Sequence, residues 1–148
     1  MLEGTTLRAV GFGIVGGLLG TILMDAVMIA TFLSAGESAD LFFSAVGEKL
    51  GDGAVVGAAL HNVIGMSGGI VFTLFVTNIP ALEIVSVRKG LMLGLGAGAL
   101  TIPLGCIPLA IWLGESIVAV IAFSLLPHLV WGTVLGWVFS RGMLARKD

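Results

Sequence analysis

The sequence has few charged residues, one cysteine and no tyrosine. Charged residues make up 11% of the 148 residues, whereas a soluble domain carries roughly 25%. Hydrophobic residues make up 57%, and the mean hydropathy is +1.14. This composition excludes an ordinary soluble fold, a disordered chain and a nucleic-acid-binding protein, and the lone Cys106 excludes an intramolecular disulfide. We therefore expect an integral membrane protein in which residues 1–148 form a single transmembrane domain.

Four apolar segments are long enough to cross a bilayer. They cover about residues 9–33, 54–77, 90–113 and 117–139. A helix crosses the hydrocarbon core with about 20 apolar residues, and the four segments together hold one charged residue, Asp25. The short connections favour helices that run up and down beside one another. The sequence predicts an all-α fold, an integral membrane four-helix bundle that contacts the lipid bilayer.

The basic residues are distributed unevenly between the ends of these segments. If the N-terminus is inside, Lys49 is the only basic residue outside. The other six lie at the inner ends: Arg8, Arg88, Lys89, Arg141, Arg146 and Lys147. Because cytoplasmic loops carry the excess of lysine and arginine, we expect a multi-pass protein of the cell's inner membrane with both termini in the cytoplasm.

The connection at residues 34–53 is the one long outer loop. Its apolar residues fall near helical spacing between charged ones, as in Leu41, Phe42, Ala45 and Val46. This pattern predicts a short amphipathic helix on the outer surface. The inner connection at residues 78–87 contains Pro80 and is typical of a turn.

The chain contains an internal repeat. Residues 61–72 match residues 128–139 at six of twelve positions, beginning with a histidine in each copy. The first and third apolar segments align more weakly at a shift of 80 residues, which places Asp25 opposite Gly105. The sequence thus predicts two parallel-repeated helical hairpins, residues 8–77 and 88–141, related by a pseudo-two-fold axis along the membrane normal.

Four polar or ligand-type residues fall inside the apolar segments, one in each: Asp25, His61, Cys106 and His128. Polar groups at such depth are costly and face the bundle interior. Imidazoles bind haem iron and transition metals, so His61 and His128 predict a bis-histidine site for haem b or a metal ion. Asp25 and Cys106 are further candidate metal ligands. A ligating imidazole donates its other N–H to an acceptor, for which Asp25 or a backbone carbonyl would serve.

Two glycines follow each histidine at i+4 and i+8: Gly65, Gly69, Gly132 and Gly136. One interpretation is a slot that lets a flat porphyrin approach the backbone, which makes these glycines cofactor-binding. The other is close approach of the second and fourth segments, because small residues four apart favour helix contact in membranes. The spacing does not separate the two.

Three function classes remain open. The first is a haem- or metal-binding protein that uses His61 and His128. The second is a proton or metal-ion transporter or channel that uses Asp25 and the histidines. The third is a structural subunit without any cofactor, in a homo-oligomer or a larger membrane complex. The chain has no phosphate-loop, metalloprotease or nucleophile-elbow motif, so no catalytic residue is assigned.

Three stretches carry a family resemblance: residues 59–75, 88–108 and 126–141, the last with the run Pro127-His128-Leu129-Val130-Trp131. They resemble the YagU-like group of small prokaryotic inner-membrane proteins. That group has a histidine in its second helix, a glycine-rich third helix and a final helix with a His-Leu-Val-Trp-type run. The resemblance implies a four-helix membrane fold and nothing about chemistry.

Overall fold

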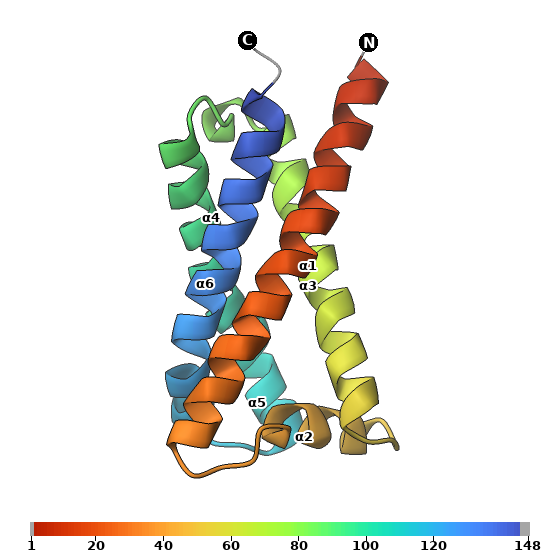
Figure 1. The fold of residues 1–148 in the computed structure, drawn as a ribbon, viewed down its shortest axis with the longest axis vertical. Helices are drawn as coiled ribbons and strands as arrows, with labels where there is room; N and C mark the ends of the chain where they lie inside the picture. Colours follow the sequence, from red (N-terminus) through yellow and green to blue (C-terminus); the bar gives the residue numbers. More distant parts are fainter. Residues whose placement is uncertain (1, 146–148) are drawn as a thin grey trace.

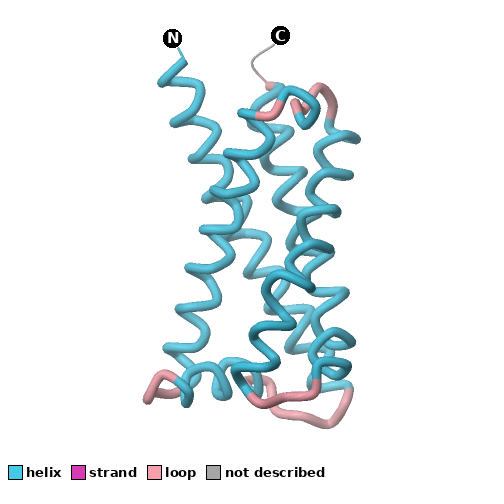
Figure 2. Tube along the Cα trace, turned by 180° about the vertical axis from the view of Figure 1, so that it is seen from behind, coloured by secondary structure: helices cyan, strands magenta, loops and turns pink. Residues whose placement is uncertain are grey.

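The computed structural model describes residues 2–145, and these fold into helices joined by loops at the two ends of a bundle (Figures 1 and 2). Four helical stretches are long and apolar enough to cross a membrane: Leu7–Ser34, Ala54–Asn78, Val87–Leu113 and Ile117–Leu144. Their bounds lie within a few residues of the predicted segments. The chain is therefore a multi-pass, all-helical membrane protein, as the sequence predicts.

The element order adds short helices to the four long ones. Helix α1 (Leu2–Ser34) leads through a turn to α2 (Leu41–Lys49) and α3 (Ala54–Asn78). A 3₁₀ turn (Pro80–Leu82) precedes α4 (Val87–Thr101), and α5 (Ile107–Leu113) and α6 (Ile117–Leu144) complete the chain. Helix α2 is the predicted amphipathic helix, and Phe43 and Val46 are its buried side chains.

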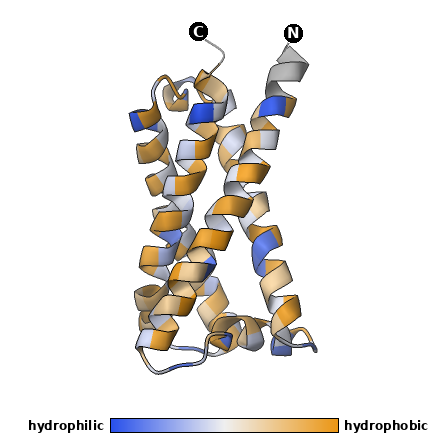
Figure 3. Cartoon of the chain, viewed as in Figure 1, coloured by the Kyte–Doolittle hydropathy of each residue, from blue (hydrophilic) through white to orange (hydrophobic). Residues whose placement is uncertain are grey.

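Both termini lie at one end of the bundle, and α2 lies at the other (Figure 1). We call these the terminus end and the α2 end. Hydrophilic residues gather mainly near the two ends (Figure 3). At the terminus end, the Arg8 side chain donates a 2.7 Å hydrogen bond to the carbonyl of Gly142 and lies over the Phe12 ring. Arg146 and Lys147, which the predicted basic bias includes, lie outside the described residues.

The four spans form two hairpins that start from the same end. Helix α1 packs along α3, and α4 packs along α6. Both α1 and α4 begin at the terminus end, and both α3 and α6 return to it (Figure 1). The hairpins are therefore parallel copies, as the repeat predicts.

Glycines bring α1 and α3 of the first hairpin into backbone contact. Gly13 lies against Gly69, and Gly17 lies against Gly65 and Met66. A Cβ atom on any of these glycines would collide with the opposite helix. Membrane helices use small residues for this kind of close approach because lipid gives no hydrophobic drive for association.

The second hairpin repeats this contact. Gly90 lies against Gly136, and Gly94 lies against Gly132. Gly13 and Gly17 thus correspond to Gly90 and Gly94, which is a shift of 77 residues. The predicted shift of 80 is wrong, because it gives the contacting glycines no equivalent.

The third span is interrupted between α4 and α5 by a π-helical turn, Ile102–Cys106. Prolines at 103 and 108 lack the N–H that a regular helix would use there. A π turn holds one extra residue, so no single shift aligns the whole of α1 with the third span. In the register of the glycine contacts, Ile102 takes the place opposite Asp25 that the sequence analysis gave to Gly105.

The hairpins meet along one side only. Gly16 and Gly20 of α1 lie against Leu135 and Trp131 of α6, whereas α3 and α4 barely contact each other. At a shift of 77 the positions that correspond to Gly16 and Gly20 hold Leu93 and Ala97. Leu93 and Ala97 pack against the main buried hydrophobic cluster. The bundle is therefore less symmetric than the repeat alone predicts.

Candidate functional site

Asp25 and His61 form a hydrogen-bonded pair between α1 and α3. The Nδ1 atom of His61 lies 2.8 Å from Oδ1 of Asp25, and the two side chains are 12% and 16% exposed. His61 lies seven residues into α3 from the α2 end, or about 10 Å along the helix axis. The carboxylate orients the imidazole with Nδ1–H as donor and leaves Nε2 as an acceptor. This is the acceptor role that the sequence analysis gives to Asp25.

Two phenylalanines of α2 cover the His61 ring. The ring centroids of Phe42 and Phe43 lie 5.0 and 6.0 Å from that of His61, with Phe42 edge-on. Helix α2 is held in place because the backbone at Phe43 contacts Gly57 of α3, which leaves no room for a Cβ atom there. The α2 end of the Asp25–His61 pair is therefore closed by aromatic side chains. The sequence predicts the helix but does not predict this contact.

His128 makes a different set of contacts. Its Nδ1 lies 2.8 Å from the carbonyl oxygen of Ser124 on the same helix, α6. Its Nε2 lies 3.6 Å from Sγ of Cys106, which is 3% exposed in the π turn. The backbone carbonyl thus serves as the acceptor for this histidine, the second of the two predicted options. Nε2 is left to accept from the thiol.

The four predicted metal ligands form two pairs and do not form one cluster. Asp25 contacts His61 within the first hairpin, and Cys106 contacts His128 within the second. Among the described residues, no group of three or more histidine, cysteine, aspartate or glutamate side chains is placed to hold a metal ion. The physical reason is that the two histidine-bearing helices, α3 and α6, barely contact each other, and the Trp131 ring lies between them at Gly68. The predicted four-residue constellation is not assembled.

The four candidate cofactor-binding glycines are covered by the other helix of their hairpin, Gly65 by the Thr21 side chain and the other three by backbone. Gly65 and Gly69 contact α1, and Gly132 and Gly136 contact α4. These faces therefore offer no slot to a flat ligand. The alternative prediction, close approach of the second and fourth spans to each other, is also wrong, because the glycines close each hairpin internally.

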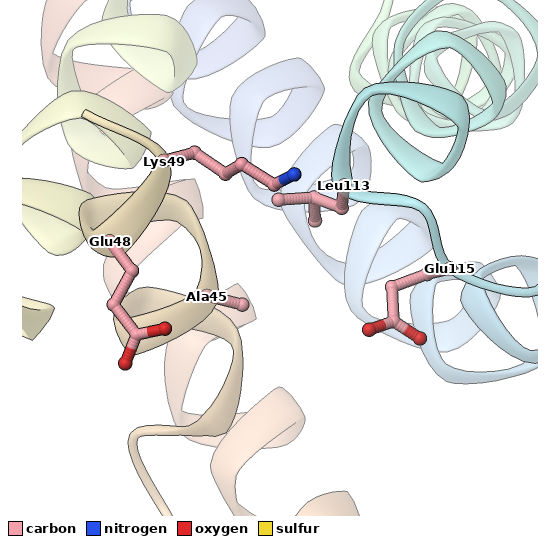
Figure 4. Close-up of a pocket in the computed structure, with 5 residues that line it drawn as sticks. All are labelled: Ala45, Glu48, Lys49, Leu113 and Glu115. Carbon is pink, nitrogen blue, oxygen red and sulfur yellow. The ribbon is translucent and has the colours of Figure 1, made fainter. Parts of the chain in front are cut away.

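A separate open pocket lies at the α2 end, between α2 and the turn that follows α5 (Figure 4). Its volume is about 280 Å³, and it is lined by Ala45, Glu48, Lys49, Leu113 and Glu115. Figure 4 shows the Lys49 side chain reaching toward Leu113, with the Glu48 carboxylate turned away from it. The pocket contains none of the residues of the two histidine pairs.

Residues 7–147 match the model of DUF6789, a family of unknown function. The chain belongs to the DUF6789 family. This match neither supports nor contradicts the resemblance to the YagU-like group. No curated protein and no solved structure matches the chain.

In this DUF6789 member Asp25 and His61 bring together a carboxyl group and an imidazole, two kinds of group that exchange protons in proteins. His128 instead contacts a backbone carbonyl and a thiol.

Proposed function

We propose that this protein conducts protons through the membrane by way of the Asp25–His61 pair. The observation that carries the proposal is the 2.8 Å contact between Nδ1 and Oδ1, within two spanning helices. An ionisable side chain inside a membrane is costly and marks ion pathways and proton relays. We further propose that the terminus end faces the cytoplasm of the cell's inner membrane, because the basic residues gather there.

The packing of the first hairpin supports a functional role for the pair. Gly13, Gly17, Gly65 and Gly69 already hold α1 against α3 through backbone contact. The second hairpin is closed in the same way with Ile102 in the place that corresponds to Asp25. An acid is therefore not needed to join two such helices. Its presence in one copy only favours a functional role over structural support.

The haem and metal hypotheses have less support than proton conduction. The glycine faces that were to admit a porphyrin are filled by neighbouring helices. The ring of Trp131 lies against Gly68 of α3, and so occupies space between the helices that carry the two histidines. The third class, a structural subunit, is the outcome if no proton moves.

A proteoliposome assay tests the proposal. Purified protein is reconstituted with a pH-sensitive dye inside the vesicles, and a potassium diffusion potential drives protons inward. We expect flux above protein-free vesicles, at least tenfold lower in Asp25→Asn and in His61→Gln. Asp52→Asn is the matched control, because Asp52 is an exposed acid in the loop before α3.

Each result of this assay bears on the proposal. Flux that falls in both site variants and persists in Asp52→Asn supports it. Wild-type vesicles no leakier than empty ones, or Asp25→Asn vesicles as active as wild type, would overturn it. Circular dichroism and size-exclusion profiles show whether each variant keeps the wild-type fold.

A further inference from the structure

An open apolar pocket lies about midway along α6. Its volume is about 260 Å³, and all of its lining residues belong to this one helix: Leu126, Leu129, Val130, Thr133 and Val134. The one hydroxyl among them is that of Thr133, which donates to the carbonyl of Leu129 within the helix. The pocket therefore offers no free side-chain donor, and it suits an apolar occupant.

This pocket faces away from the other helices of the bundle. Gly132 and Gly136 of α6 face α4, and Trp131 and Leu135 face α1. The lining residues take up the part of the helix surface that is left beside these contacts, and Leu126 is 58% exposed. Because α6 is long and apolar enough to cross a membrane, this part of its surface meets the acyl chains of the bilayer.

Arg141 lies on the same face of α6, at the terminus end. Val130 and Val134 precede it by eleven and seven residues. At about 100° per residue, each lies within about 20° of Arg141 around the helix. Along the axis, Val134 is about 10 Å and Val130 about 16 Å from Arg141. The hydrocarbon of one leaflet is about 15 Å deep, so a lipid whose acyl chain reaches this pocket has its headgroup beside Arg141.

A second arginine lies at the same level on the neighbouring helix. Gly90 of α4 packs against Ser140 of α6, and Arg88 and Arg141 are close neighbours of these two residues in the chain. Both arginines are exposed, and no acidic side chain that the structure describes forms an ion pair with either. Guanidinium groups in this position at a membrane surface favour the phosphate of an anionic lipid.

We propose that the outer face of α6 binds one anionic phospholipid, with an acyl chain in the pocket around Val130 and the phosphate beside Arg141 and Arg88. The lipid lies in the leaflet at the terminus end. The two arginines select it over zwitterionic lipid, because their attraction to a headgroup grows with its net negative charge. The site uses none of the residues that are proposed to conduct protons, so it stands or falls independently of that function.

Quenching of Trp137 fluorescence by brominated lipids tests the site. Trp137 lies within about 40° of Arg141 around α6 and is 49% exposed. In a Trp112→Phe background the other tryptophan is Trp131, which is buried, so contact quenching reports on Trp137. The protein is placed in phosphatidylcholine vesicles with a small fraction of brominated lipid, either phosphatidylglycerol or phosphatidylcholine. We expect brominated phosphatidylglycerol to quench several-fold more than brominated phosphatidylcholine at the same fraction.

Two pairs of variants test the arginine and the pocket separately. Arg141→Gln should remove most of the preference for phosphatidylglycerol. Lys89→Gln is its control, because Lys89 is a base at the same end whose ammonium donates to the carbonyl of Ala81. Val130→Phe fills the pocket and should also lower the preference. Val63→Phe is the matched control for this change, because Val63 is 52% exposed on α3.

Equal quenching by the two lipids in the Trp112→Phe protein would overturn the proposal. An equal loss of preference in Arg141→Gln and Lys89→Gln would indicate general attraction of anionic lipid to the terminus end and would also overturn it. If Val130→Phe behaved as Val63→Phe does, the pocket would have no part in binding. Quenching by neither lipid would show that protein, such as a second copy of this chain, covers the face instead.

A competition measurement needs no variant of the arginine, and it decides the question if Arg141→Gln does not fold. Unbrominated phosphatidylglycerol is added at a fixed fraction of brominated phosphatidylglycerol. We expect it to relieve the quenching of Trp137 several-fold more than the same amount of added phosphatidylcholine. Equal relief by the two lipids would mean that the face has no selective site.

Discussion

Thr73 and Ser140 occupy equivalent buried positions in the two hairpins. Both are fully buried, and each follows its histidine by twelve residues. The Thr73 hydroxyl lies over Gly13, and the Ser140 hydroxyl lies over Gly90. In each copy a histidine, two glycines and a small hydroxyl residue thus recur every four residues along the face that packs against the partner helix. In each hairpin this face packs against the other helix and so fixes the position of the histidine.

Replacing a glycine of this face should destabilise the bundle. A methyl group on Gly69 would collide with the backbone of Gly13, which cannot move aside as a side chain can. We expect Gly69→Ala to cost about 2 kcal/mol or more, in the range of overpacked cores. Gly96→Ala is the control, because that position is open and alanine is a better helix former by about 1 kcal/mol.

Unfolding in mixed micelles measures both variants. Gly136→Ala should behave as Gly69→Ala does, because it meets the backbone of Gly90 in the second hairpin. If Gly69→Ala were as stable as Gly96→Ala, the close contact of α1 with α3 would be wrong.

The fold was largely predictable from sequence because hydropathy reports helix length directly. The repeat that begins at residues 61 and 128 was also visible, since both copies bury the same helix face and keep similar residues on it. The alignment of α1 with α4 was not predictable from the sequence, because their many glycines and leucines allow several alignments. The weak alignment of the first and third apolar segments predicts a shift of 80, and only the contacts of Gly13 and Gly90 give 77.

A spectrum of the purified protein tests the haem hypothesis. Neighbouring helices occupy the space beside the glycines that follow His61 and His128. We therefore expect no Soret band in the oxidised or reduced protein. If haem is added to the protein, any absorption band that appears should persist in His61→Ala and in His128→Ala. A band that needs both histidines would show that the bundle opens to bind haem.

The candidate site was only partly predictable. Its residues were found because a charge or an imidazole inside an apolar segment is conspicuous. The contacts among these residues were not predictable, since they depend on helix rotation and on the π turn that places Cys106.

Asp40 should titrate below its ordinary range. The Ser44 hydroxyl, which donates to Oδ2 at 2.8 Å, and then the Ser38 hydroxyl lower the pKa of this exposed carboxyl before α2. A carboxyl whose pKa is lowered by folding stabilises the fold above its unfolded pKa, and this contribution is lost as the pH falls through the folded value. Ser44→Ala should raise the Asp40 pKa in a carboxyl ¹³C NMR titration, whereas Ser67→Ala should not. An unchanged titration in Ser44→Ala would contradict this contact.

Labelling tests the proposed orientation. In a Cys106→Ala background, Ser38→Cys and Val85→Cys place exposed thiols at the α2 end and the terminus end. We expect a membrane-impermeant maleimide to label position 38 from outside intact cells and position 85 only after lysis. The reverse pattern would place the terminus end outside.

A double-mutant cycle separates a coupled Asp25–His61 pair from two independent polar residues. Removing either partner leaves the other largely buried without its hydrogen bond, so Asp25→Ala and His61→Ala should each destabilise the protein by about 2 kcal/mol. The double variant should cost less than the sum by a similar amount, since residues in contact are not additive. The matched control is Cys106→Ala with His128→Ala. His128 keeps its Nδ1 bond to Ser124 within α6, so this coupling should be under about 0.5 kcal/mol. If the two couplings were equal, the Asp25–His61 contact would be no stronger than a thiol beside a ring, and its role as a charge-holding site would lose its basis.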